Sequence, residues 1–232
     1  MSIDVTFDVR SDAQGLDPDQ HSPTLRQFHK QLWSKELPTG GTLDLSDQVH
    51  NAYLHADVNG REFVLTSDGA IPTFTMRKRL QSLLSAVPAD ELEAFRNVAF
   101  TIGGFMIFPG MRRNGKMTIN GARGFNSLIS DRFDLTLECI RRHYQHQSSP
   151  LTESLELYAD WFELFGDFAG FTDFFILQDF VTDGHEVRFH MPFDDFKSSA
   201  VPKDLATYMD YKALLIKLVA LRNQRISLAT SK

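Results

Sequence analysis

The stretch AYLHADVNGREFVLTSD at residues 52–68 decides the fold class. Its two runs, AYLHAD and REFVLTSD, alternate apolar and polar side chains, which is the pattern of half-buried strands. Asn59-Gly60 stands between them, and this dipeptide is a strong signal for the two-residue turn of a β-hairpin. We therefore predict an antiparallel hairpin at the start of a sheet.

Further short alternating segments extend this sheet. IDVTFDV at residues 3–9 has the strand pattern, and so does EVRFHMPF at residues 186–193. FMIFPG and KMTING flank the loop at residues 111–115 and predict a second hairpin. We expect a mainly antiparallel sheet formed by residues 3–9, 42–75, 100–120 and 186–193.

Helical patterns dominate the second half of the chain. Ser22-Pro23 predicts a first helix, because Ser favours the N-cap and Pro the first helical position. The other predicted helices cover residues 77–86, 89–96, 125–146, 151–166, 170–182 and 203–225. Strands followed by helices favour an α+β fold, with the N-terminal sheet packed against the C-terminal helices. No break in composition divides the chain, so we expect a single domain over residues 1–232.

Composition and charge exclude several classes of protein. The formal net charge is −6, which makes non-specific nucleic-acid binding unlikely for this chain. The single cysteine, Cys139, excludes an intrachain disulfide framework and indicates a reducing compartment. No secretory signal opens the sequence, and the most apolar stretch, residues 168–181, is too short and polar to span a bilayer. We expect a cytoplasmic protein.

Several long motifs resemble an uncharacterised bacterial family, a domain of unknown function. They are TIGGFMIFPG, TINGARGF, DRFDLTLECIRRHY, LFGDFAGFTDFFILQDFV and PFDDF, and DPDQHSPTLRQFHKQLWSKELPTG is similar to the family too. The resemblance covers most of the chain. It implies a bacterial or phage origin and one full-length domain, but no activity.

The predicted helix 125–146 carries polar side chains on its apolar face. At 100° per residue, Arg132, Thr136 and His143 fall near the middle of a broad apolar arc. A buried arginine needs a partner, because an unpaired buried charge is costly. Two interpretations stay open. Arg132 is either a structural residue paired inside the core, or a catalytic anion-binding group with His143 as proton donor.

The segment at residues 171–181 offers partners for Arg132. It is apolar on every side apart from Asp173 and Asp179, and buried carboxylates are nearly always paired. Six helical steps place these two carboxylates about 120° apart, so they do not share a face. We expect one of them to pair with Arg132, and we predict no metal site.

The loop TINGARGFN before this helix predicts an anion site. Gly121 and Gly124 allow a close backbone approach, and a helix start offers free N–H groups. Arg123 can add a bidentate contact to phosphate, and Asn120 lies beside it. The alternative is an ordinary turn whose glycines serve its geometry, with a solvated basic loop at Arg112, Arg113 and Lys116. The loop matches neither a Walker motif nor a dinucleotide fingerprint.

Two classes of function remain. The first is an enzyme or binding protein for a small phosphate- or nucleotide-like anion, built on Asn120, Arg123, Arg132 and His143. The second is a protein-interaction module of a bacterial defence or regulatory system, with an exposed aromatic patch around Trp33 or Trp161. The sequence identifies no cofactor and does not decide whether the chain is an enzyme. Arg141 and His146 have the spacing of one class of toxin ribonucleases, but so short a window arises easily by chance.

Overall fold

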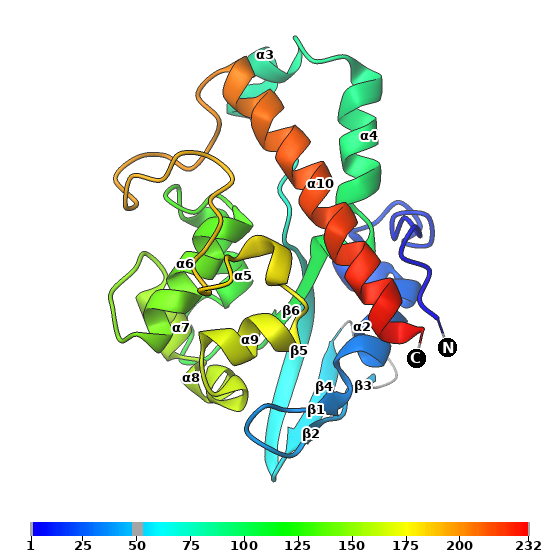
Figure 1. Cartoon of the computed structure of the whole chain (residues 1–232), viewed down its shortest axis with the longest axis vertical. Helices are drawn as coiled ribbons and strands as arrows, with labels where there is room; N and C mark the ends of the chain where they lie inside the picture. The colour runs from blue at the N-terminus through cyan, green and yellow to red at the C-terminus, as the bar shows by residue number, and fades with distance from the viewer. Residues whose placement is uncertain (1, 48–52, 232) are drawn as a thin grey trace.

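A computed structural model describes residues 2–47 and 53–231 (Figure 1). It has antiparallel sheets in the N-terminal half and helices packed against them, so the predicted α+β class is confirmed. The strands are β1 (Lys35–Glu36), β2 (Thr42–Leu43), β3 (Ser46–Asp47), β4 (Leu54–Val58), β5 (Arg61–Gly69) and β6 (Phe105–Pro109). The α-helices are α1 (Pro18–His21), α2 (Pro23–Trp33), α3 (Gln81–Leu84), α4 (Ala89–Ala99), α5 (Ile119–Phe125), α6 (Phe133–Tyr144), α7 (Thr152–Glu156), α8 (Ala159–Phe162), α9 (Phe168–Phe174) and α10 (Leu205–Thr230). The 3-10 helices are η1 (Lys78–Leu80), η2 (Ile102–Gly104), η3 (Glu163–Phe165) and η4 (Gln178–Phe180).

The main sheet has the order β3-β4-β5-β6, and every neighbouring pair is antiparallel. The predicted Asn59-Gly60 hairpin is confirmed, with Val58 opposite Arg61. Asn59 and Gly60 have φ of 54° and 79°, which is the left-handed backbone that a tight hairpin turn requires. All five residues of β6 are buried, because helices cover this part of the sheet.

The N-terminal segment is not a strand, contrary to the prediction for residues 3–9. The Asp4 carboxylate accepts from the Thr6 amide at 2.9 Å, and Asp8 accepts from the Arg10 amide at 2.9 Å. Such side-chain bonds to the backbone two residues ahead fold the chain into turns and compete with strand pairing. The segment still contributes to the core through the buried side chains of Ile3 and Val9.

Two other predicted strands are also wrong. KMTING does not pair with β6, because the Thr118 side chain accepts from the Gly121 amide and starts α5 instead. In EVRFHMPF, only Val187 makes a strand-like bridge, to Val181. The sheet therefore ends at β6 within the described residues.

The predicted helix 125–146 is shorter than expected, because α5 ends at Phe125 and α6 begins only at Phe133. Ser130 and Asp131 have φ of 50° and 63°, which no helix can continue. The Asn126 side chain accepts from the Leu128 amide at 2.9 Å and stabilises the turn. Arg132 is consequently the N-cap residue of α6 and not a residue of its middle.

The long helix α10 crosses the front of the molecule beside α4 (Figure 1), and contacts η2 and η4 as well. Arg222 of α10 is fully buried and donates to the carbonyls of Gly103, Phe105 and Phe175 at 2.9–3.0 Å. Asn223 accepts from the Gly103 amide at 2.8 Å. A Cβ on Gly103 would lie 2.5 Å from the Asn223 side chain, so only glycine permits this approach.

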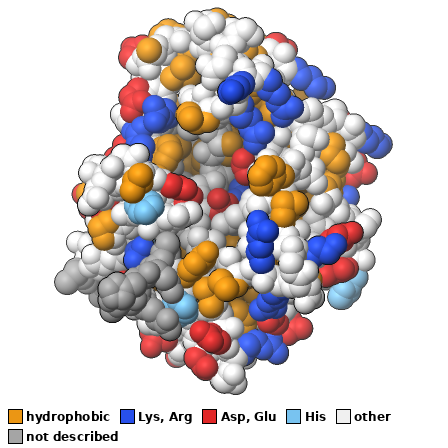
Figure 2. All heavy atoms as spheres, turned by 180° about the vertical axis from the view of Figure 1, so that it is seen from behind, with side chains coloured by type: hydrophobic (Ala, Val, Ile, Leu, Met, Phe, Trp, Pro, Cys, Tyr) orange, Lys and Arg blue, Asp and Glu red, His pale blue; other side chains and the backbone are white. Residues whose placement is uncertain are grey.

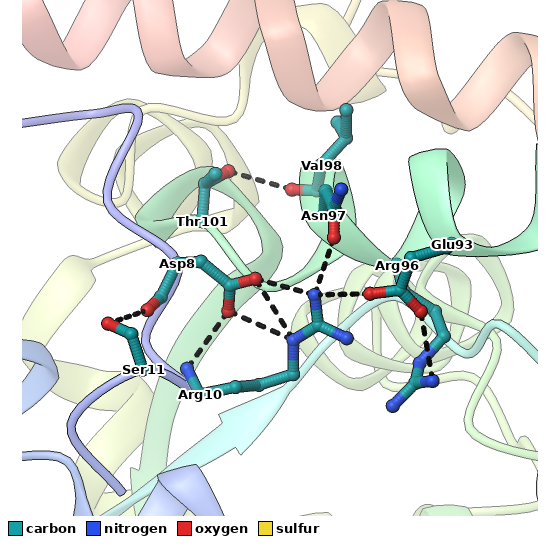
Figure 3. Close-up of polar contacts among 8 residues, drawn as sticks. All are labelled: Asp8, Arg10, Ser11, Glu93, Arg96, Asn97, Val98 and Thr101. Carbon is teal, nitrogen blue, oxygen red and sulfur yellow. Dashed lines mark hydrogen bonds and ion pairs between the residues drawn. The ribbon is translucent and has the colours of Figure 1, made fainter. Parts of the chain in front are cut away.

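The N-terminal segment is held against α4 by Arg10. Figure 3 shows its guanidinium between Asp8 and two side chains of α4, Glu93 and Asn97. Its carbon lies 4.9 Å from the ring centroid of Phe100, and the Phe100 carbonyl accepts from the Val9 amide at 3.0 Å. These contacts fix the position of Phe100 at the end of α4.

Within residues 2–47 and 53–231, no helix is both long enough and apolar enough to cross a membrane.

Replacing Arg222 tests its role in joining α10 to the rest of the fold. Arg222→Met removes the donor for three carbonyls, and each buried acceptor without a donor costs about 1–3 kcal/mol. We expect the free energy of unfolding to fall by about 3 kcal/mol or more, measured by urea denaturation. The control is Arg225→Met on the same helix. The half-exposed guanidinium of Arg225 pairs with the Asp179 carboxylate, and its loss should change stability by about 1 kcal/mol. Equal losses for the two variants would contradict this role.

Candidate functional site

A cleft of about 530 Å³ lies where α1, the end of β5, residues 71–77 and the turn after α5 meet. We call it the Asp19 cleft. Its lining includes four carboxylates, from Asp17, Asp19, Asp68 and Asp131. Figure 2 shows the molecule from behind, where acidic side chains border a hollow near the centre and basic side chains lie above it.

Local sequence places Asp19 in this cleft. Asp17 is the N-cap of α1 and accepts from the Asp19 amide at 3.2 Å, while Pro18 occupies the first helical position. Asp19 thus lies in the first turn and faces the end of β5, where its Oδ2 accepts from the Gly69 amide at 3.3 Å. Its Oδ1 is buried and has no hydrogen-bond partner within residues 2–47 and 53–231.

The surroundings make Asp19 hard to ionise. Burial, together with the nearby charge of Asp17, raises its pKa to about 6, although the Gly69 amide, the Ser67 hydroxyl and the Arg123 charge act in the opposite direction. The carboxyl therefore exchanges its proton close to neutral pH, which is typical of groups in functional sites.

A hydrogen-bonded chain behind the cleft fixes the proton on His29. The Trp33 indole donates to His29 Nδ1 at 3.0 Å, and an indole N–H can only donate. Burial, with the charge of Arg222, lowers the pKa of His29 to about 3, so its ring is neutral. The proton of the neutral ring must be on Nε2, which donates to Ser67 Oγ at 2.9 Å. His29 is therefore not a base for Ser67, and the Ser67 hydroxyl keeps its own proton to donate toward the cleft.

Arg123 of α5 lies fully buried beside the cleft. It forms an ion pair with Asp68, its Nε donates to Thr136 Oγ1 at 2.8 Å, and its Nη2 donates to the Asp131 carbonyl at 2.9 Å. Burial lowers the pKa of Arg123, and the charges of Asp131 and Asp19 oppose that shift. All three guanidinium nitrogens of Arg123 therefore contact groups of the protein itself.

The rim of the cleft is held by a second ion pair. Arg77 lies 2.9 Å from Asp131, whose left-handed backbone turns the chain between α5 and α6. A Cβ on Gly124 would lie 3.1 Å from the Asp131 carboxylate, so this glycine allows the turn to pack on α5.

The other residues of the predicted anion loop have structural partners. The Gly121 amide is capped by Thr118 Oγ1 at 3.2 Å, so it does not point free into a cavity. Asn120 donates to the Ser67 carbonyl at 3.4 Å, and its Oδ1 is buried without a partner in the described chain. Asn120, Arg123 and Gly124 thus lie near the Asp19 cleft, although Arg123 reaches carboxylates there.

Arg132 is buried, but its partner differs from the expected ones. Its Nε donates to Asp134 Oδ1 at 3.1 Å, and Asp134 also accepts from the His190 amide at 2.8 Å. Burial would raise the pKa of Asp134, yet the charges of His190 and Arg132 and their hydrogen bonds lower it below its usual value. The prediction of Asp173 or Asp179 as the partner is wrong. Asp173 is exposed and accepts from Gln178, and Asp179 pairs with Arg225.

His143 lies apart from the predicted arginines. It is half-buried in the last turn of α6, with its ring 5.2 Å from that of Phe162, and burial lowers its pKa. Eleven residues separate it from Arg132, which corresponds to about 16 Å along a helix axis. Thr136 links Arg123 and Arg132, since its hydroxyl accepts from the first and donates to the carbonyl of the second. The structure therefore brings together the two arginines but not His143.

Two further predicted features have simple structural explanations. Arg113 of the basic loop pairs with Asp160 at 2.7 Å. Lys116 of the same loop lines a different pocket from the Asp19 cleft. Burial raises the pKa of the Cys139 thiol to about 12, which suits the inert core cysteine expected from the sequence.

Sequence reasoning missed Asp19, Asp68 and Asp131. The only local signal was Asp17-Pro18, an N-cap followed by proline, which could have predicted α1 in a segment taken as a polar loop. No local pattern reveals that the end of β5 buries Asp19, because that contact joins residues 50 positions apart.

The raised pKa of Asp19 predicts a pH-dependent cost to stability. The folded protein holds this proton more tightly than the unfolded chain does, whose carboxyl has a pKa near 3.8, so the contribution favours folding at low pH and is lost as the pH rises through about 6. Asp19→Asn removes the titration. We expect it to be more stable than the wild type at pH 8 by about 1–3 kcal/mol, with the difference disappearing near pH 4. Urea denaturation at both pH values measures this, and a less stable variant at pH 8 would show that the Asp19 charge is a structural partner of Arg123.

Breaking the buried Arg132–Asp134 pair should be costly. Arg132→Ala leaves Asp134 buried beside His190, and removal of one partner of a buried pair costs about 3–5 kcal/mol. Arg96→Ala is the control, since its exposed pair with Glu93 contributes at most about 0.5 kcal/mol. Equilibrium unfolding compares them, and a small loss for Arg132→Ala would mean that water or another group reaches Asp134.

Comparison with known proteins gives one match. A family model described as a family of unknown function, DUF6994, matches residues 3–226. No curated protein matches the chain, and no solved structure does. The match confirms the predicted resemblance to a domain of unknown function, and it covers nearly the whole sequence. The chain belongs to the DUF6994 family.

Proposed function

We propose that this protein binds a small organic ligand in the Asp19 cleft. One observation carries the proposal: a buried carboxyl oxygen, Oδ1 of Asp19, lies at a cleft of about 530 Å³ without a hydrogen-bond partner in the described residues. Buried acceptors are nearly always paired in folded proteins. The Ser67 hydroxyl and the Gly69 amide donate to the Asp19 carboxyl, and a donor on a ligand would pair the oxygen that remains. The cleft volume is in the range of small-molecule sites.

An anionic ligand, which the sequence favoured, has little support. The three nitrogens of Arg123 already meet Asp68, Thr136 and Asp131. The surrounding carboxylates would repel a phosphate or nucleotide. The proposed catalytic roles of Arg132 and His143 also lack a shared cavity, so binding is a better-supported function than catalysis.

A protein-interaction role is the second candidate, and a different surface supports it. Phe125 is 84% exposed and lines a shallow groove together with Met117. Adjacent exposed apolar side chains such as these are found at protein-interaction surfaces when they belong to a larger apolar patch. The tryptophans expected to form such a patch do not, because Trp33 and Trp161 are fully buried.

We also propose that the chain forms one domain and lies in the cytoplasm. A hydrophobic core that joins buried residues from Ile3 to Ile226 supports one domain over residues 1–232. The single buried thiol, Cys139, supports a cytoplasmic location.

Hydrogen–deuterium exchange with a mixed fragment library tests ligand binding. The library contains neutral, cationic and anionic compounds of similar size. We expect some of them to slow exchange in residues 17–21 and 68–77, which line the cleft, and to leave the end of α10 unchanged. The same compounds should protect the Asp90→Asn variant, whose exposed carboxylate lies outside the cleft, as they protect the wild type. Absence of protection by any compound, of whatever charge, would contradict the proposed function.

A further inference from the structure

The charges around the Asp19 cleft are unbalanced. Four carboxylates line it, whereas two guanidinium groups, those of Arg77 and Arg123, contact them. Each arginine is paired with one carboxylate, Asp131 and Asp68 respectively. Asp17 and Asp19 are left with no cation as a partner among the described residues, so the cleft has an excess of negative charge.

The unpartnered oxygen of Asp19 requires a hydrogen-bond donor as well as charge. The Gly69 amide donates to its Oδ2, and the Ser67 hydroxyl also stabilises the ionised carboxyl, but its Oδ1 is buried with no partner in the described chain. A cation that carries N–H groups satisfies both needs, because charge-assisted hydrogen bonds to a carboxylate are the strongest that an amine or guanidinium makes. A quaternary ammonium group lacks the donor and satisfies only the charge.

A metal ion fits this cleft less well than an organic cation. Metal ions need several ligand atoms grouped at one point. Among the described residues, no three His, Cys, Asp or Glu side chains are grouped in that way. The carboxylates of the cleft are spread along its walls and are partly paired with arginines.

Aromatic rings form the apolar part of the same cleft. Phe74, Phe100 and Phe105 line it, with Phe100 partly exposed and the other two almost fully buried, at 3% and 2% exposed. Phe74 has φ of 62°, which is unusual for a bulky residue, and Phe100 is fixed by the Arg10 network of Figure 3. Aromatic walls beside carboxylates suit a ligand with a cationic head and an apolar ring.

We propose that the ligand of the Asp19 cleft is an organic cation with N–H donors, a primary ammonium or guanidinium group attached to an apolar ring. This inference rests on the proposed ligand-binding function and specifies the class of ligand. The cationic group meets the Asp19 carboxylate, and the ring packs on the phenylalanines.

Four probes that share one ring separate the requirements. Benzylamine has charge and donors, benzyltrimethylammonium has charge alone, benzyl alcohol has a donor alone, and benzoate is an anion. We expect benzylamine to bind the wild type about tenfold more tightly than benzyl alcohol or benzyltrimethylammonium, and benzoate to bind least, by NMR titration at pH 8 and low salt. Exchange protection in residues 17–21 and 68–77 locates the binding in the cleft.

Variants of the chain supply the control. Asp19→Asn should weaken benzylamine binding about tenfold and leave benzyl alcohol binding nearly unchanged, because it removes the charge but keeps the shape. This variant is expected to fold, since the neutral amide removes a destabilising buried charge. Asp90→Asn should bind benzylamine like the wild type.

The outcomes separate this inference from the broader proposal. Equal binding of all four probes, or tighter binding of benzoate, would overturn the cationic class while leaving a small-ligand site in place. Protection of the cleft by Mg²⁺ or Ca²⁺ in place of benzylamine would assign it to a metal and overturn the inference too. If none of the probes binds at millimolar concentration, the inference is wrong, and the fragment library decides separately whether the cleft binds any small molecule.

Discussion

A single buried guanidinium joins the parts of this fold. Among the described residues, Arg222 has no carboxylate partner and instead donates to carbonyls of η2, of β6 and of the residue that follows α9. Burial lowers the pKa of Arg222 to about 9. Its charge is the second cause, next to burial, of the lowered pKa that keeps His29 neutral. Because α10 must approach η2 closely for these bonds, a residue with a Cβ at position 103 would clash with α10. The arrangement of sheet and helices depends on this contact between the C-terminal helix and the strand that follows η2.

The elements that the sequence predicted well are those whose signal is local. The Asn59-Gly60 turn and the Ser22-Pro23 helix start are decided by the backbone preferences of two residues, and both are present. The strand predicted at residues 3–9 is wrong because the Asp4 and Asp8 carboxylates accept from backbone amides two residues ahead, which periodicity does not detect. The break after α5 comes from the left-handed backbone of Ser130 and Asp131, which the helical spacing of the apolar residues does not detect.

The candidate site shows the same division. The sequence correctly identified Arg132 as a buried arginine that needs a partner, because its apolar neighbours place it in the core. It treated Arg123 as a contact for an anion, whereas the structure buries this arginine among groups of the protein. It could not identify the partners. Asp68, the partner of Arg123, comes from β5. Asp134, the partner of Arg132, is the second residue of α6, and the expected helix 125–146 placed it on the polar face opposite Arg132. A predicted anion site thus became a site of excess negative charge, since the sign of a cleft depends on side chains that distant segments bring together.

The acidic cleft lowers the stability of the fold at neutral pH, and this loss of stability is an argument about its function. Asp19 is less stable ionised in the folded chain than in water, and Phe74 beside it has a left-handed backbone that a bulky residue rarely adopts. The Phe74 ring itself belongs to the core, where it lies 5.3 Å from the ring of Tyr211. The Asp19 charge does not support the core, which is held by Arg222, by the Arg132–Asp134 pair and by a continuous set of apolar side chains. An asparagine at residue 19 would keep the helix start and remove the buried charge. A carboxylate that destabilises the fold and has an unpaired oxygen at a cleft is therefore best explained by what binds to it.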